Sequence, residues 1–195
     1  MKLAIFDFDD TIVKGQTPDS FCEFALNRLN KNYFQKLIFY LNKFKLMPKA
    51  FKIRKKLLLF SLKGTKKNTI NKISKEFFNT LIFNKKIINE IKNYKLKNFK
   101  IVIVSGAYQS YLRFFKMADD HISNEFNYKK NIFTGILKSK DCLGAQKVNR
   151  ILKKYTYKDL NSAVFFSDSM TDEPLFRIVK RAYFYDGKIK LLKFN

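Results

Sequence analysis

The spacing of hydrophobic positions changes along the chain, and each change predicts a different kind of element. Residues 2–6 form a short apolar run that ends in acidic residues, which is typical of a buried strand. From residue 14 to residue 92 the apolar positions recur at helical spacing instead. Helices are expected here from Ser20, where Glu23 three residues later suggests a capping box, and over residues 31–45, 48–64, 66–82 and 84–95.

From residue 100 onwards the pattern alternates between strands and helices. Strands are expected over residues 100–104, 163–167 and 182–185, and helices over 107–118, 145–154 and 172–180. Two short β segments within 122–138 flank residues 127–131, which suggests a hairpin. This alternation predicts an α/β fold, a doubly wound (Rossmann-like) parallel sheet with helices on both faces. We expect residues 1–13 and 93–195 to form this core and residues 14–92 to form a helical insertion.

The composition narrows the choice of partners. The 195 residues are 46% hydrophobic, enough for one packed domain carrying an insertion, and the net charge is +24. Lysines outnumber arginines 34 to 6, whereas nucleic-acid grooves and phosphate forks rely more on arginine. A coding bias toward Lys, Asn, Ile and Phe explains the basicity at least as well as nucleic-acid binding does. We therefore expect no stable nucleic-acid partner, although a basic surface attracts anionic substrates.

The remaining bulk features favour a cytoplasmic protein. Cys22 and Cys142 lie far apart and match no metal or redox spacing, which favours a reducing compartment. The four-residue apolar run before Asp7 is too short for a signal peptide, and no apolar stretch predicts a transmembrane helix. Residues 37–60 mix basic and apolar side chains, so they either pack within the insertion or make weak contact with an anionic membrane surface. A monomer or a homodimer is expected.

Four short motifs carry the candidate chemistry. They are Asp7-Phe8-Asp9-Asp10-Thr11, Ser105-Gly106, Lys147 at a predicted helix start, and Asp168-Ser169-Met170-Thr171-Asp172. Three of the four follow predicted parallel strands, and open α/β sheets bind their ligands at the carboxyl ends of such strands. Each motif alone has an ordinary explanation: an acidic turn, a Ser-Gly turn, or a surface lysine in a lysine-rich chain. Their joint occurrence, in this order, points to phosphoryl transfer.

The residue types suit that chemistry. A carboxylate can attack a phosphate monoester and form an aspartyl-phosphate intermediate, while a second carboxylate exchanges protons with the leaving oxygen and with water. Hard carboxylate oxygens also suit magnesium, which keeps several of its waters and binds substrate phosphate. Without a cation, a cluster of Asp7, Asp9, Asp168 and Asp172 would repel itself strongly.

The order and spacing of the motifs resemble those of the haloacid dehalogenase superfamily of phosphohydrolases. The resemblance implies that Asp7 is the nucleophile, that Asp9 is the general acid and base, and that Thr11 orients the loop. It further implies phosphate binding by Ser105, Gly106 and Lys147, the lysine also pairing with the nucleophile. Mg2+ would be held by Asp7, the backbone carbonyl of Asp9, and Asp168, with Asp172 acting through a bound water.

The C-terminal half resembles the phosphoserine-phosphatase-like branch, subfamily IB, in which residues 14–92 would be a type-1 cap. The resemblance rests on Phe133-Thr134-Gly135, Gly144-Ala145-Gln146-Lys147-Val148 and Asp168 to Leu175. Gln16 stands where phosphoserine phosphatases carry a glutamate that reads the substrate ammonium, so the charge pairing is lost. Arg54 stands roughly where they carry an arginine for the substrate carboxylate, although a solvated arginine on a basic helix is the alternative.

We therefore expect a magnesium-dependent phosphatase acting on a small phosphorylated substrate, a phosphate monoester other than phosphoserine. The alternatives are a phosphoserine phosphatase, a phosphatase acting on a nucleic-acid end or a lipid-linked phosphate, and a non-catalytic binding module. The last is disfavoured because Asp7, Asp9, Lys147 and Asp168 are all present.

Overall fold

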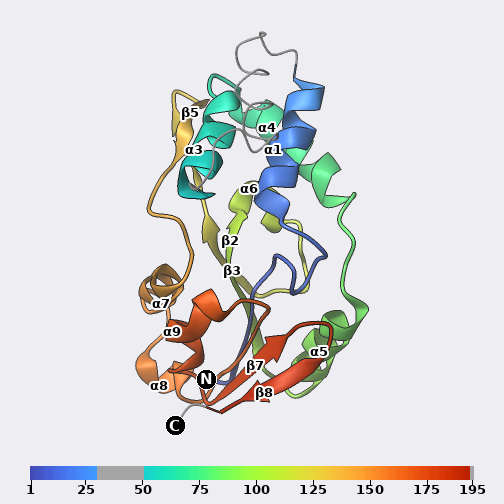
Figure 1. The fold of residues 1–195 in the computed structure, drawn as a ribbon, viewed down its shortest axis with the longest axis vertical. Coiled ribbons are helices and arrows are strands. Elements are labelled where there is room, and N and C mark those ends of the chain that lie inside the picture. Colours follow the sequence, from blue (N-terminus) through green and yellow to red (C-terminus); the bar gives the residue numbers. More distant parts are fainter. Residues whose placement is uncertain (30–50, 194–195) are drawn as a thin grey trace.

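The structure, a computed structural model, describes the chain over residues 1–29 and 51–193, and its side chains over 1–29 and 55–193. The molecule is elongated, with a sheet near one end and a group of helices at the other (Figure 1). The predicted helix over 31–45 and the predicted helix start at Pro48 lie outside the described residues. Among the described helices, none is both long enough and apolar enough to cross a membrane.

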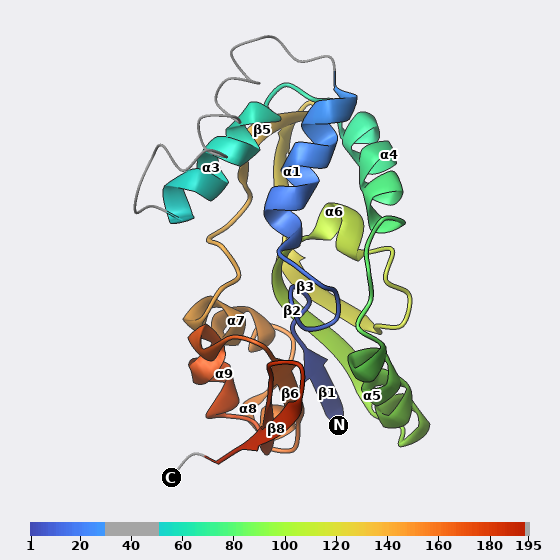
Figure 2. The ribbon, with the colours of Figure 1, turned by 45° about the vertical axis from the view of Figure 1, so that its right-hand side comes forward.

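A six-stranded sheet forms the base of the molecule. Its strands, in spatial order, are β3 (Asp120–Asn124), β2 (Lys100–Tyr108), β1 (Leu3–Phe6), β6 (Val164–Ser167), β7 (Arg181–Tyr185) and β8 (Ile189–Leu192). All neighbours pair in parallel except β7 and β8. The sheet is covered on one side by α5 (Lys85–Leu96) and on the other by α7 (Ala145–Ile151), α8 (Tyr157–Leu160) and α9 (Glu173–Phe176) (Figure 2). The predicted doubly wound α/β fold is confirmed.

The central strand β1 shows why these residues form a buried sheet. All four of its side chains are buried, and successive side chains point to opposite faces. Phe6 belongs to the same apolar cluster as Ile87 and Ile91 of α5, whereas Ile5 belongs to the cluster that includes Ile151 of α7. A strand covered on both faces must be apolar at every position, which explains the uninterrupted run in the sequence.

Within the described residues, three helices lie at the other end of the molecule. They are α1 (Thr17–Arg28), α3 (Phe51–Ser61) and α4 (Lys67–Phe78), and the antiparallel hairpin of β4 (Phe126–Lys129) and β5 (Ile132–Leu137) lies beside them (Figure 1). The hairpin is tied to the segment that follows α3: Gly64 N donates to Phe133 O and Phe133 N donates to Thr65 O, both at 2.9 Å. Phe133 itself is fully buried. The hairpin therefore packs on the helical end, although its residues belong to the segment 93–195 that was predicted to be core. The division of the chain into a core and a cap stays a prediction.

The predicted helix over 107–118 is wrong for most of its length. Strand β2 continues to Tyr108, and only the four residues of α6 (Gln109–Leu112) are helical. Ala107 and Tyr108 are fully buried within the strand, so tertiary packing overrides their weak local preference for helix. Beyond α6 the chain turns towards β3, with Phe115 buried.

Three smaller differences concern the start of the first helix, the helix predicted over 172–180 and one additional strand. The first helix begins at Thr17 with Gln16 as its N-cap, so Ser20 lies inside the helix and forms no capping box. Its hydroxyl donates instead to Gln16 O at 3.0 Å. The predicted helix over 172–180 is split into a 3-10 turn, η1 (Met170–Asp172), and the short α9. Strand β8, which the sequence analysis did not predict, pairs antiparallel with β7 at the edge of the sheet.

Candidate active site

A bulge in β2 presents the Ser105-Gly106 motif. Val104 pairs with Ile122 and Tyr108 with Asn124, so three residues of β2 lie opposite a single residue of β3. Bulges of this kind redirect backbone and side chains near the end of a strand. The Ser105 hydroxyl, which is buried, accepts a hydrogen bond from Ala107 N at 3.1 Å. The strand was expected to end at residue 104, but it continues past the motif, and the bulge places Ser105 and Gly106 near the carboxyl edge of the sheet.

The acidic loop after β1 is held by its own carboxylates. The Asp7 carboxylate accepts from Phe8 N at 2.8 Å, and Asp7 N donates to Phe166 O of the neighbouring strand. Asp10 has a positive φ of 50°, a conformation that asparagine, aspartate and glycine tolerate best. Its carboxylate accepts from Gly15 N and from the Gln16 side chain, each at 2.7 Å. Asp10 therefore closes the loop that leads to α1, and the Gln16 amide is partly engaged by it.

Lys147 connects two of the predicted carboxylates. It extends from the first turn of α7 and is 1% exposed. Its Nζ lies 3.0 Å from Asp7 Oδ1 and 2.6 Å from Asp172 Oδ2. Burial alone would lower the pKa of Lys147, but the two carboxylates outweigh burial and raise the pKa above its ordinary value. The lysine is thus charged at neutral pH and compensates part of the acidic cluster.

Thr11 ties the two acidic loops together. Its hydroxyl donates to Asp168 Oδ1 and accepts from Asp168 N, both at 3.0 Å. Burial, and then the nearby charge of Asp7, raise the pKa of Asp168 to about 6. The structure therefore brings the side chains after β1 and β6 to one place, as the carboxyl ends of adjacent parallel strands require.

Asp172 has one satisfied oxygen and one unsatisfied oxygen. Oδ2 accepts from Lys147 and from the Ser167 hydroxyl, the latter at 2.7 Å. Oδ1 is buried and has no hydrogen-bond partner among the described residues. Burial raises the pKa of Asp172 despite the neighbouring lysine. The acidic cluster is therefore short of positive charge and of hydrogen-bond donors.

These observations fit a magnesium ion. Over the described residues, no three Asp, Glu, His or Cys side chains form a complete metal site by themselves. Magnesium commonly uses only one or two carboxylates and fills its remaining positions with water and substrate phosphate. Asp7 and Asp168, whose negative charges repel each other, are the side chains that would hold it, together with the Asp9 carbonyl. The unsatisfied oxygen of Asp172 could accept a hydrogen bond from a water bound to this ion.

Asp9 is buried beside the start of α1. Its Oδ1 accepts from Thr17 N at 3.0 Å and from the Thr17 hydroxyl, which also bonds to the hydroxyl of Tyr111 at 2.7 Å. Burial first, and then the charge of Asp7, raise the pKa of Asp9 to about 7, although the bonds from Thr17 oppose this rise. A carboxyl with a pKa near neutral can both give and take a proton at physiological pH.

A pocket of about 190 Å³ opens beside Asp9. It is lined by Asp9, Gln16, Pro18, Asp19, Lys55, Gly106 and Leu143. Because Asp9 and Gly106 come from the sheet edge while Lys55 comes from α3, the pocket lies where the helical end meets the sheet. Gln16 lines this pocket, and its role in substrate binding stays a prediction. The side chain of Arg54 lies outside the described residues.

Lys55, like Pro18, Asp19 and Leu143, lines the pocket although it was not among the predicted site residues. Its side chain is buried, and its Nζ lies 2.8 Å from Asp141 Oδ2 and 3.1 Å from Gly106 O. Asn124 supports both partners, because its Nδ2 donates to Gly106 O and to Asp141 Oδ1. Asp141 lies 86 positions after Lys55, so no local pattern could have revealed the pair.

Comparison with known proteins decides the family. The model of haloacid dehalogenase-like hydrolases matches residues 4–177. The chain belongs to the haloacid dehalogenase-like hydrolase family. It is therefore a hydrolase, as the motifs predicted. No curated protein sequence matches it.

Solved structures place this hydrolase within the family by fold. A protein of unknown function from Bordetella pertussis Tohama I has a TM-score of 0.76 at 17% identity, covering 93% of this chain and 88% of that one. A family hydrolase from Salmonella enterica serovar Typhi has a TM-score of 0.64 at 17% identity over 91% of this chain, which spans 60% of that protein. A phosphoserine phosphatase holding a phospho-aspartyl intermediate analogue has a TM-score of 0.61 at 21% identity, covering 93% and 84% of the two chains. The predicted phosphoserine-phosphatase-like fold is confirmed.

Proposed function

We propose that this hydrolase is a magnesium-dependent phosphatase that cleaves a small phosphate monoester through an aspartyl-phosphate on Asp7. The observation that carries the proposal is the buried Lys147, which lies within 3.0 Å of Asp7 and 2.6 Å of Asp172 at the carboxyl edge of the sheet. Burying a lysine between two carboxylates costs desolvation free energy that the ion pairs often do not repay, so a purely stabilising role explains it poorly. The lysine is well placed to meet the negative charge of a phosphoryl group beside the nucleophile.

The chain's own residues supply the steps. The Asp7 carboxylate attacks phosphorus, the bond from phosphorus to the leaving oxygen breaks, and Asp9 gives that oxygen its proton. Asp9 then takes a proton from water as the water attacks the phosphorus of phospho-Asp7, which releases phosphate and restores the carboxylate. The Ser105 hydroxyl, the Gly106 amide and Lys147 would hold the phosphoryl oxygens. Bound magnesium supplies additional neutralisation of phosphoryl charge.

The pocket beside Asp9 supports a small substrate. Its volume of about 190 Å³ suits a group of a few heavy atoms beyond the phosphate. Lys55 offers a positive charge there, Gln16 an amide and Asp19 a carboxylate. We infer that Lys55 binds the part of the substrate that leaves with the bridging oxygen.

Phosphoserine is the second candidate substrate, because the pocket contains both a cation and an anion. A substrate carboxylate could approach Lys55, and its ammonium could approach Asp19, which lies one helical turn after Gln16. Asp19 would then replace the charge that Gln16 lacks. A substrate without an ammonium group would instead leave Asp19 without a role in recognition.

The direct test is phosphate release from a panel of monoesters by the wild type and by Asp7→Asn, with and without magnesium. The panel contains phosphoserine, sugar phosphates, nucleotides, a lipid phosphate, a 5′-phosphorylated oligonucleotide and an aryl phosphate. We expect magnesium-dependent release that falls at least about a thousandfold in Asp7→Asn. Asp186→Asn, the same charge change at an exposed site on the far edge of the sheet, should retain full activity.

The outcome for each substrate separates the alternatives. If the folded wild type releases phosphate from none of them, or if Asp7→Asn stays active, the proposed mechanism is wrong. A preference for the oligonucleotide that weakens steeply with salt would favour a nucleic-acid substrate. For the preferred small substrate, Lys55→Gln should raise KM with a smaller change in kcat, since Lys55 lies in the pocket rather than beside the nucleophile.

A further inference from the structure

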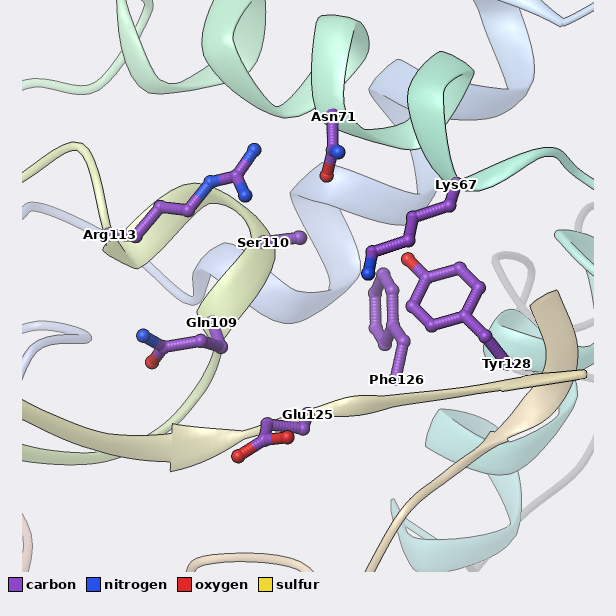
Figure 3. A pocket seen from close by; sticks show the side chains of 8 residues that line it. All are labelled: Lys67, Asn71, Gln109, Ser110, Arg113, Glu125, Phe126 and Tyr128. Carbon is purple, nitrogen blue, oxygen red and sulfur yellow. The ribbon is translucent and has the colours of Figure 1, made fainter. Parts of the chain in front are cut away.

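A second pocket, of about 180 Å³, lies between α4, α6 and strand β4. It is lined by Lys67, Asn71, Gln109, Ser110, Arg113, Glu125, Phe126 and Tyr128. None of these residues lines the pocket beside Asp9. In the close view, the guanidinium of Arg113, the amide of Asn71 and the ammonium of Lys67 are directed into one space above Ser110 and Phe126 (Figure 3). We refer to this space as the α4–α6 pocket.

The α4–α6 pocket carries uncompensated positive charge. Within the described part of the chain, neither Lys67 nor Arg113 forms an ion pair with a carboxylate. The acidic lining residue, Glu125, is engaged elsewhere, because its carboxylate lies 3.1 Å from Lys138 Nζ. Two cations that face one small pocket repel each other unless an anion lies between them.

Buried polar atoms in the same pocket also lack partners. The Ser110 hydroxyl and Arg113 Nε are both buried and form no hydrogen bond to any described residue. Unsatisfied buried donors are rare in folded proteins, since each costs about 1–3 kcal/mol. Both come from the same short segment, and both are donors that a ligand oxygen can satisfy.

One wall of the pocket is aromatic. Phe126 is buried, Tyr128 is half-buried, and Lys67 Nζ lies 5.6 Å from the centre of the Tyr128 ring. Burial raises the pKa of Tyr128 to about 12, so its hydroxyl stays protonated at neutral pH and adds no negative charge. An anion is therefore accepted without repulsion from this wall, and an apolar group attached to the anion has a surface to contact.

We propose that the α4–α6 pocket binds a small molecule bearing a phosphate or carboxylate group, at a site separate from the catalytic carboxylates. Arg113 and Ser110 hydrogen-bond the oxyanion, and Lys67 and Asn71 approach it from α4. Such a ligand ties α4, in the predicted cap, to α6, which directly follows the bulge that carries Ser105. Tyr111 of α6 bonds to Thr17, which bonds to Asp9, so the bound ligand fixes a segment in contact with the proposed acid.

The test is calorimetric titration of the metal-free protein with inorganic phosphate, phenylphosphonate and benzoate. Phenylphosphonate has no ester bond to hydrolyse, and chelation of magnesium weakens phosphate binding at the acidic cluster. We expect Arg113→Gln to weaken binding at least tenfold and Lys67→Gln about three- to tenfold. Lys72→Gln, the same charge change on the exposed side of α4 outside the pocket, should leave the affinity unchanged.

The three probes identify the source of the oxyanion. Tighter binding of phenylphosphonate than of phosphate supports an organic ligand that contacts Phe126 and Tyr128, and equal binding supports free phosphate. Equal affinity in the wild type, Arg113→Gln and Lys67→Gln would overturn the proposal, as would saturation only at tens of millimolar for every probe. Because Lys67 is exposed, its variant should fold even if Arg113→Gln does not. The titration measures binding and not catalysis, so its result does not depend on whether the proposed phosphatase activity is confirmed with Asp7→Asn.

Discussion

Replacing Lys147 by methionine removes the positive charge from between two buried carboxylates. Methionine has a similar length and flexibility, so the change removes the charge while leaving little empty space. In the wild type, Nζ lies 3.0 Å from Asp7 and 2.6 Å from Asp172, and Lys147 and Asp172 are each 1% exposed. The variant therefore isolates the electrostatic contribution of the lysine.

The expected cost is large. Breaking a buried ion pair by removing one partner destabilises a protein by about 3–5 kcal/mol, since the other charge stays buried and unpaired. Domains of this size are stable by roughly 5–15 kcal/mol, so about a fifth or more of the free energy of unfolding would be lost. Phosphate release should also fall, because the same cation is proposed to face the phosphoryl group.

The loss should depend on pH with a definite sign. Burial raises the pKa of Asp172 in the folded wild type, and Lys147 lowers it; without the lysine, the pKa rises further. A group whose pKa is raised on folding stabilises the protein below its unfolded pKa and loses that contribution as pH rises through the folded value. The destabilisation of Lys147→Met should therefore be greater at pH 8 than at pH 5.

Urea unfolding of the metal-free protein, followed by circular dichroism at both pH values, measures this loss. Adding Asp172→Asn to Lys147→Met removes the stranded charge and should restore part of the stability without restoring activity. Lys153→Met, the same substitution at an exposed position of the next turn, should change stability by less than about 0.5 kcal/mol. A loss below about 1 kcal/mol in Lys147→Met, or no recovery in the double variant, would refute the electrostatic account.

Three further predictions follow from other contacts. Because burial raises the pKa of Asp9 from 3.8 to about 7, the metal-free protein should lose stability as pH rises from 5 to 8, by at most roughly 3 kcal/mol. The stability of Asp9→Asn, measured by thermal unfolding, should depend less on pH. Thr17→Val removes a hydrogen bond that holds the Asp9 pKa down. The alkaline limb of kcat/KM should therefore move upward by about one pH unit, and an unchanged limb would show that Asp9 is not the acid. Phe133→Ala should lower the free energy of unfolding, measured with urea, by about 3–5 kcal/mol. The Phe133 ring is buried, and its centroid lies 4.6 Å from that of Phe126. Ile136→Ala, at an exposed position of the same hairpin, should have little effect on stability.

The sequence by itself determined the layout of the core and the location of the candidate site. Strands buried on both faces must be apolar throughout, so short apolar runs in the sequence were enough to predict β1, β2 and β6. The polar motifs after them converge because parallel strands end at one edge of the sheet. For the same reason Asp7, Ser105 and Asp168 could be placed together without any knowledge of their contacts.

Other features depend on contacts between distant residues, which only the tertiary structure decided. The α6 helix is short because Ala107 and Tyr108 are buried in a bulged strand, whereas their local sequence is compatible with helix. The sequence around Lys55 does not distinguish it from the many other lysines of the chain. In the structure it differs from them because its side chain is buried and contacts Asp141 and Gly106. A charge pattern does not encode which lysine will be buried, because the energy that selects it comes from a partner 86 residues away.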